Sequence, residues 1–324
     1  MKRMKGTVRF AWRWIGPVVF VALIWNTNMS QVSEAWRHGR AGLLLAAAGL
    51  NAVILLVKAW RWRRLMQLQG IHYRFGPAAR YYAIGSAMAA WTPGRLGDFG
   101  RALAVHRDRK VGLGRAASSV IADRVLDAVA LAGVAAIGAA FLPGPNGLLR
   151  LAAAGIVASA VAAWFLVRGT QGGMVRRGAE RIVGKFGRLG AAGEEVGAAL
   201  DGLSDLARPA LGVPVGLTVM ATAVTFLQGY FVARSLSIDV GFWTLSVALA
   251  AVSIASLLPV TVAGFGTREA TLLLFLGPAG IRWDQIIAFS LAYVVIISGS
   301  LALMGAAAWV MRPGASGAVV ESNP

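Results

Sequence analysis

The sequence TPGRLGDFGR occupies residues 92–101, and the sequence LPVTVAGFGTRE occupies residues 258–269. Both stretches place charged side chains beside proline and glycine within otherwise apolar sequence. Proline and glycine interrupt helices, and an ionisable group at membrane depth needs a partner or a polar cavity. The two stretches therefore predict broken helices that carry charge inside a membrane, which is typical of a transport site.

The composition favours a membrane protein. Hydrophobic residues make up 57% of the 324 residues and charged residues only 14%, well below the roughly 25% charged residues of a soluble domain. Five uncharged stretches approach or exceed the roughly 17 to 25 residues of a membrane helix. They are Ala41–Val57, Leu151–Val167, Ala210–Ala233, Val240–Thr267 and Gln285–Met311. With a retained first helix at about 14–29, preferred to a cleaved signal peptide, we expect an all-α polytopic integral membrane protein with about 6 to 8 membrane helices.

The basic residues are distributed unevenly, which bears on the partner of a chain with a net charge of +18. The tail to Arg13, residues 58–115, residues 168–208 and Arg312 hold 25 of the 32 basic residues. The connections on the other side hold Arg37, Arg40, Arg150, Arg234 and Arg282. The positive-inside rule then predicts that both termini are cytoplasmic. Basic loops at a membrane surface favour anionic lipid headgroups, and not nucleic acid, as partners.

The chain divides into two similar halves. We expect a single transmembrane domain, residues 1–324, with a first half at 1–168, a cytoplasmic amphipathic linker at 169–209, a second half at 210–312 and a short cytoplasmic tail at 313–324. The sequence GDFGR at 97–101 resembles GFGTR at 264–268. An odd number of membrane crossings between them would make the halves an inverted repeat, although a glycine-rich chain also produces such matches by coincidence.

Two segments of the first half predict local structure. Residues 77–91 are short for a span and have basic sequence on both sides, so we expect a re-entrant segment that turns near Pro93 and Gly94. The sequence KAWRWRR at 58–64 predicts an interfacial anchor of tryptophan and arginine side chains.

The predicted helix at about 115–142 carries Asp123, Arg124 and Asp127 in its first half. Asp123 and Asp127 share a helix face, and Arg124 lies three residues before Asp127, so we expect Arg124 to pair with Asp127. Two interpretations stay open: a solvated ion pair at a helix start, or a shared polar cavity with Asp98 and Arg101.

Several classes of chemistry lack their sequence signals. The chain has no cysteine, and no metal-ligand spacing, phosphate-binding Walker loop or nucleophile elbow occurs. We therefore expect no cofactor, no metal and no catalytic residues. An enzyme acting on polyprenyl or phospholipid phosphates is the alternative, and the carboxylates nearest to such a site are those of Asp98, Asp108, Asp123 and Asp127.

Three stretches carry a family resemblance: PGRLGDFGR at 93–101, AASSVIADRVLD at 116–127, and the segment from Leu258 to Ala270. In this order they resemble the transmembrane region of lysylphosphatidylglycerol synthetases, a flippase-like family, over about 14–311. The resemblance implies a multi-pass protein of the bacterial inner (plasma) membrane that moves lipid between leaflets. The fused enzymes carry an aminoacyltransferase domain after this region, so we expect a stand-alone member that does not make lysyl lipid.

The charged residues of both motifs predict a headgroup site. Guanidinium groups bind phosphate in a bidentate manner, and we expect Arg101 and Arg268 to do so. Glycines would allow the backbone and a half-helix start to approach the phosphate. These glycines are Gly97, Gly100, Gly264 and Gly266. Carboxylates would orient the arginines and take up a proton. The remaining candidates for this site are Asp98, Asp123, Arg124, Asp127 and Glu269.

These observations predict translocation or binding of an anionic phospholipid or lipid-linked headgroup. Each arginine has an alternative role in an internal salt bridge that only locks a broken helix. A non-transporting scaffold for envelope or lipid biosynthesis enzymes is the alternative for the whole chain, and it would tolerate neutral substitutions of Arg101 and Arg268.

Overall fold

Long uncharged stretches form helices because a helix satisfies its own backbone hydrogen bonds where no water is present. The computed structural model describes residues 29–140, 197–199, 201–203, 211–256 and 266–311, and all regular structure in these ranges is helical. Within them, α3 (Ala41–Leu68), α10 (Gly212–Ser235) and α13 (Trp283–Val310) are long and apolar enough to cross a membrane. The predicted all-α membrane architecture is confirmed.

The other helices are shorter or carry charge. They are α2 (Met29–Arg37), α4 (Phe75–Trp91), the 3₁₀ helix η1 (Pro93–Asp98), α5 (Phe99–Arg109), α6 (Leu113–Ala140), α11 (Phe242–Ala255), α12 (Thr267–Leu276) and the 3₁₀ helix η3 (Gly277–Ala279). The helices expected before residue 29 and at 151–167, and most of the linker at 169–209, lie outside the described residues.

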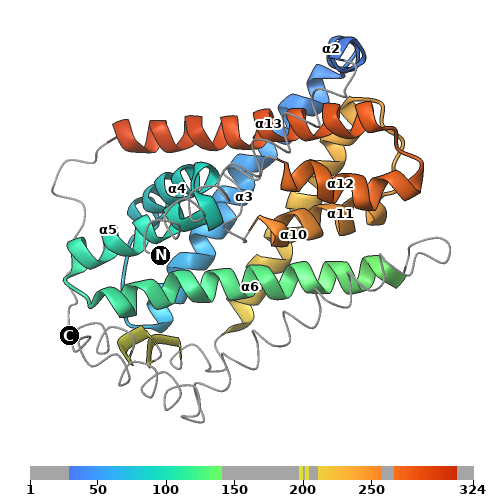
Figure 1. Ribbon diagram of the computed structural model, residues 1–324. Coiled ribbons are helices and arrows are strands. Elements are labelled where there is room, and N and C mark those ends of the chain that lie inside the picture. The colour runs from blue at the N-terminus through green and yellow to red at the C-terminus, as the bar shows by residue number, and fades with distance from the viewer. Residues whose placement is uncertain (1–28, 141–196, 200, 204–210, 257–265, 312–324) are drawn as a thin grey trace, which may run out of the picture.

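An antiparallel pair of helices, α3 and α10, forms the centre of the fold (Figure 1). At one end the backbone nitrogen of Arg40 donates to the carbonyl oxygen of Ser235 over 2.9 Å. Toward the other end Nη1 of Arg61 donates to Oγ1 of Thr218 over 3.1 Å. The start of each helix therefore lies near the end of the other.

Each central helix begins a set of four helices, and the two sets interlock. The order α3–α4–α5–α6 is repeated as α10–α11–α12–α13, and α4 packs against α13 as α11 packs against α6. Near the start of α4, Nε of Arg80 donates to the carbonyl oxygen of Ala308 at the end of α13 over 2.8 Å. Near the start of α11, Trp243 and Val247 lie against Gly138 at the end of α6. Figure 1 shows α13 and α6 on opposite sides of the molecule, with α4 and α5 at one end and α11 and α12 at the other.

This exchange of equivalent contacts is the arrangement of an inverted repeat. The central helices are antiparallel and the short helix of each set packs on the long last helix of the other, so the two sets have opposite orientations. The described elements thus favour a repeat over coincidence as the reason for the two similar motifs.

The chain reverses between α4 and α5. Helix α4 ends at Trp91, two residues before Pro93, as expected because a proline disfavours helix in the residue before it. Gly94 and Arg95 both have left-handed backbone conformations, with φ of 58° and 56°. A Cβ atom at Gly97 would lie 2.4 Å from the carbonyl carbon of Met88, so η1 packs directly on α4. The predicted turn near Pro93 and Gly94 is present, and its depth in a membrane stays a prediction.

Candidate functional site

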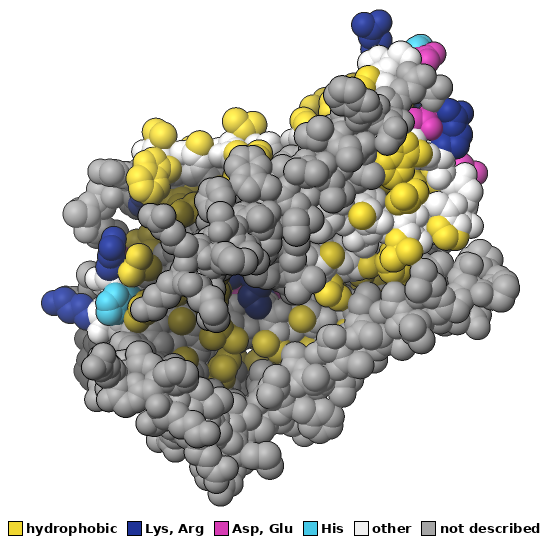
Figure 2. Space-filling view, viewed as in Figure 1, with side chains coloured by type: hydrophobic (Ala, Val, Ile, Leu, Met, Phe, Trp, Pro, Cys, Tyr) yellow, Lys and Arg dark blue, Asp and Glu magenta, His cyan; other side chains and the backbone are white. Residues whose placement is uncertain are grey.

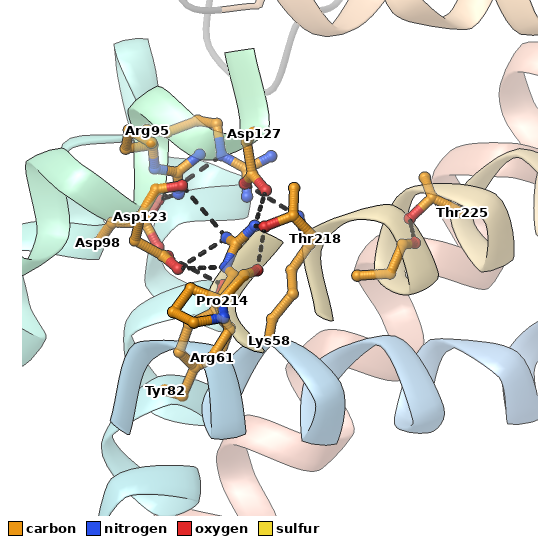
Figure 3. Close-up of polar contacts among 12 residues, drawn as sticks. Lys58, Arg61, Tyr82, Arg95, Asp98, Asp123, Asp127, Pro214, Thr218 and Thr225 are labelled. Carbon is orange, nitrogen blue, oxygen red and sulfur yellow. Dashed lines mark hydrogen bonds and ion pairs between the residues drawn. The ribbon is translucent and has the colours of Figure 1, made fainter. Parts of the chain in front are cut away.

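Asp123 of α6 is the centre of a buried charged cluster that joins three helices (Figure 3). Its Oδ1 lies 2.6 Å from Nη2 of Arg61 on α3, and its Oδ2 lies 2.7 Å from Nη2 of Arg101 on α5. All three side chains are fully buried. Each carboxylate oxygen therefore has its own arginine, which offsets much of the cost of burying these charges.

Asp127 extends the cluster by one helical turn. Its Oδ2 lies 3.0 Å from Nζ of Lys58, and its Oδ1 lies 2.7 Å from Nη1 of Arg61. The same Arg61 nitrogen also donates to Thr218 on α10. Arg61 thus connects both carboxylates of α6 to the central helix pair, which explains why Thr218 belongs to the cluster.

Arg101 is enclosed by aromatic rings. Its guanidinium carbon lies 4.3 Å from the ring centre of Tyr82 and 5.0 Å from that of Trp62. Such cation–π contacts are strongest where water is excluded. The Tyr82 hydroxyl also donates to Oδ2 of Asp123 over 3.3 Å. In this structure Arg101 holds helix α5 against α4 and α6.

Asp98 ends η1 and is almost fully buried. It forms an ion pair with Arg124 of α6, and Nε of Arg95 lies 3.6 Å from its Oδ2. The predicted pair between Arg124 and Asp127 is therefore replaced by a pair between Arg124 and Asp98, because the chain reversal at η1 carries Asp98 to α6. Of the two open interpretations, the structure supports the shared polar region.

A cavity of about 210 Å³ lies beside this cluster, between α3, α4, α6, α10 and α13. Three basic residues and one acidic residue line it, Lys58, Arg95, Arg124 and Asp127, together with Tyr82 and Tyr293. Much of the remaining wall is apolar. Figure 2 shows basic side-chain atoms deep inside a depression in the centre of the face it presents.

Equivalent positions of the two halves line this cavity. Leu55 of α3 and Phe226 of α10 have the same position counted from the start of their helices, as do Asp127 of α6 and Ile297 of α13. The cavity therefore lies at the interface of the inverted halves, where transporters of this architecture place their substrate sites. Its charged wall comes mainly from the first half.

The second motif forms a different local structure. Gly266 has φ of 83°, and its backbone nitrogen donates to Oε2 of Glu269 over 2.7 Å. The hydroxyl of Ser290 on α13 donates to Oε1 of Glu269 over 2.5 Å. Nη1 of Arg268 lies 4.0 Å from the same oxygen. Glu269 is thus a buried helix cap that links the start of α12 to α13.

The structure separates the two arginines that the sequence predicts as phosphate ligands from the described cavity wall. Arg101 binds the buried Asp123, and neither Arg101 nor Arg268 is among the described residues that line the cavity. Gly97 has no side chain at the point where η1 packs on α4. A Cβ atom at Gly100 would lie 3.7 Å from the sulfur of Met88. Gly264 lies outside the described residues.

Sequence reasoning missed Lys58 and Arg61 as members of the site. Both belong to the predicted interfacial anchor at 58–64, yet Arg61 and Trp62 are completely buried, so that prediction is wrong for these two residues. Trp60 keeps the exposure that the anchor requires. The available signal was helical spacing, because Lys58 and Arg61 lie on the same face of α3 as the apolar Ile54.

The structure offers no obvious metal centre in the ranges it describes, since no three His, Cys, Asp or Glu side chains gather there. The described carboxylates of the cluster have arginine or lysine partners instead.

The family model of the lysylphosphatidylglycerol synthase transmembrane region matches residues 13–305. The chain belongs to this family. The resemblance carried by the three sequence motifs is confirmed, and membership of the lysylphosphatidylglycerol synthase transmembrane family indicates a function related to membrane lipid. No curated protein matches the chain.

Proposed function

We propose that this member of the family binds an anionic phospholipid or a lipid-linked anionic headgroup and moves it across the membrane. The observation that carries the proposal is the amphipathic cavity at the interface of the two inverted halves. Lys58, Arg95 and Arg124 supply positive charge on one wall, and Leu55 and Phe226 contribute to an apolar wall. A phosphate needs the first wall and the glycerol and acyl portions need the second.

The buried cluster would hold the charged wall in place. Arg61 and Asp123 connect α3 to α6, so Lys58 and Arg124 would keep fixed positions while a headgroup enters. Movement of one half against the other would then expose the cavity to alternate sides of the membrane, as in other transporters with inverted repeats.

The proposal includes no catalytic step. An enzyme acting on lipid phosphates would need a base or metal at the headgroup, and a scaffold for envelope or lipid biosynthesis enzymes would need no cavity charge. The experiment below separates these alternatives because it follows lipid movement and product formation in the same vesicles.

We also propose that the chain lies in the bacterial inner membrane with several spans and both termini in the cytoplasm. Support comes from hydrogen bonds between segments that are expected on the same side of the membrane. Gln69 donates to the carbonyl oxygen of Gly202, and both residues lie in the segments that are rich in basic residues. On the other side Arg40 meets Ser235.

Cysteine labelling tests this orientation in a chain that has no cysteine of its own. His72→Cys and Asp239→Cys place single thiols at exposed positions of the two sides. An impermeant reagent applied to intact cells should label position 239 and not position 72. Labelling of position 72 alone would show that the chain has the opposite orientation.

Purified protein in vesicles tests the transport proposal. Wild-type protein should move a labelled anionic phospholipid faster than a zwitterionic one. Arg124→Gln should reduce this rate about tenfold, since a charged hydrogen bond contributes about 1.5 to 3 kcal/mol. Arg234→Gln is the matched control, because Arg234 pairs with the exposed Asp239 away from the cavity. Equal rates for all proteins would contradict the proposal, and a converted lipid would favour the enzyme.

A further inference from the structure

The charges around the cavity do not balance. Three carboxylates belong to the cluster among the described residues, from Asp98, Asp123 and Asp127. Five basic side chains face them, from Lys58, Arg61, Arg95, Arg101 and Arg124. Arginine side chains stay protonated in proteins. The four arginines alone exceed the three carboxylates by one positive charge, and a protonated Lys58 adds a second. Uncompensated charge is costly at such a place, and an anionic ligand would compensate it.

The three basic residues of the cavity wall differ in how firmly they are held. Lys58 lies 3.0 Å from Asp127, and Arg124 contacts Asp98 directly. Arg95 shares Asp98 with Arg124, at 3.6 Å, and its buried Nε has no hydrogen-bond partner among the described residues. The Arg95 side chain is 39% exposed, compared with 23% for Lys58 and for Arg124. Arg95 is therefore the most accessible and least engaged cation of the wall.

The backbone at Arg95 gives an independent reason to assign it a function. Its φ of 56° and ψ of 34° are left-handed, a conformation that residues with a side chain rarely adopt. The turn is held by hydrogen bonds from the backbone nitrogens of Arg95 and Gly97 to Thr92, over 3.1 Å and 2.8 Å. Glycine would suit this position better. A strained residue that places a loosely paired arginine at a cavity is typical of a binding site.

We propose that Arg95 is the principal ligand of the headgroup phosphate and exchanges Asp98 for that phosphate when lipid binds. Arg124 would keep Asp98 paired, so that the exchange does not leave a buried carboxylate alone. The ligand is a phosphate ester with at least one negative charge, and the planar guanidinium binds it through two parallel hydrogen bonds. This assignment rests on the proposed function and adds the residue that selects the anion.

Binding measurements on the full chain in detergent test the assignment. The probes are short-chain phosphatidylglycerol, short-chain phosphatidylcholine and inorganic phosphate, each titrated by thermophoresis. Arg95→Gln and Arg95→Gly should both weaken binding of phosphatidylglycerol about tenfold or more, and Arg95→Lys should recover part of the loss. Arg64→Gln, which removes an exposed charge from the end of α3, should bind as the wild type does.

The melting temperature separates binding from folding. Because glycine relieves the left-handed strain, Arg95→Gly should melt at or above the wild-type temperature while binding weakly. A lower melting temperature together with unchanged affinity would assign Arg95 a structural role and overturn the proposal.

The three probes also separate this assignment from the proposed function. Unchanged affinity of Arg95→Gln with weakened affinity of Arg124→Gln would reject Arg95 and leave a lipid site. If the wild type bound inorganic phosphate as strongly as phosphatidylglycerol, the ligand would be a soluble phosphate and not a lipid. No preference of the wild type for the anionic lipid over phosphatidylcholine would reject both the assignment and the proposed function.

Discussion

The two halves of the molecule share an architecture but differ in how they use charge. Helices α3–α6 and α10–α13 follow the same order and make equivalent contacts. Asp123 of α6 and Tyr293 of α13 have the same position counted from the start of their helices. In the first half Asp123 binds two buried arginines. In the second half the equivalent residue, Tyr293, is a tyrosine that lines the cavity.

This difference shows that one backbone arrangement accommodates two kinds of support for a broken helix. The first half uses ion pairs between helices, whereas the second uses Glu269 as a cap for the start of its own helix α12. The charged wall of the cavity follows from the first solution, because Asp127 binds Lys58 as well as Arg61, and Asp98 of the same half binds Arg124. An inverted repeat with unequal halves can thus produce an asymmetric site.

The largest effect is expected from the residue that distinguishes the first half most. Asp123→Asn keeps the size of the side chain but removes the charge that Arg61 and Arg101 share, and breaking such buried pairs costs about 3 to 5 kcal/mol. We expect loss of monodisperse protein in size-exclusion chromatography and a much lower melting temperature. Asp239→Asn, at a side chain that is 95% exposed, is the control and should behave as the wild type does. A stable Asp123→Asn protein would show that the ion pairs do not hold the first half together.

The next effect concerns the glycines of the first motif. A Cβ atom at Gly97 would lie within 2.5 Å of the backbone of Met88 and Ala89, whereas one at Gly100 would meet only the flexible Met88 side chain. We therefore expect Gly97→Ala to destabilise the protein by about 1 to 3 kcal/mol. Gly100→Ala should change the melting temperature little. Similar melting temperatures for the two variants would refute the close packing of η1 on α4.

The cap of the second motif should contribute less than the ion pairs of the first. Glu269→Ala leaves the backbone nitrogen of Gly266 and the hydroxyl of Ser290 without their acceptor, which costs about 1 to 3 kcal/mol. Glu269→Gln retains an acceptor oxygen and should recover part of the loss. Thermal unfolding followed by tryptophan fluorescence measures both. If the glutamine variant were as unstable as the alanine variant, the charge of Glu269 and not its capping would be the important property.

The smallest effect on stability is expected at Arg268. Its Nη1 lies 4.0 Å from Glu269 and its side chain is 11% exposed, whereas Arg101 is fully buried against Asp123. Arg101→Gln takes one arginine from the fully buried Asp123 and should cost about 3 to 5 kcal/mol, and Arg268→Gln should cost less. The two melting temperatures provide the comparison. Equal losses would mean that the two arginines are equivalent in the two halves.

Several features of the first half of the molecule could be predicted from the sequence alone. The broken helix at 93–101 and the common helix face of Asp123 and Asp127 follow from local sequence, because proline, glycine and helical spacing act over a few residues. The meeting of these two segments in one polar region was one of two open interpretations. The partner of Arg124 could not be read in this way. Helical spacing offered Asp127, and only the chain reversal showed that Asp98 lies closer.

The sequence by itself determined that this protein is an all-α membrane protein of the lysylphosphatidylglycerol synthase transmembrane family, because apolar length, charge asymmetry and short motifs are properties of neighbouring residues. Tertiary structure alone decided which charges meet. Arg61 is buried against Asp123, which lies 62 residues further along the chain, and Arg95 faces the cavity while Arg101 does not. Those outcomes depend on how helices from both halves pack around a common interface, and no local pattern records that packing.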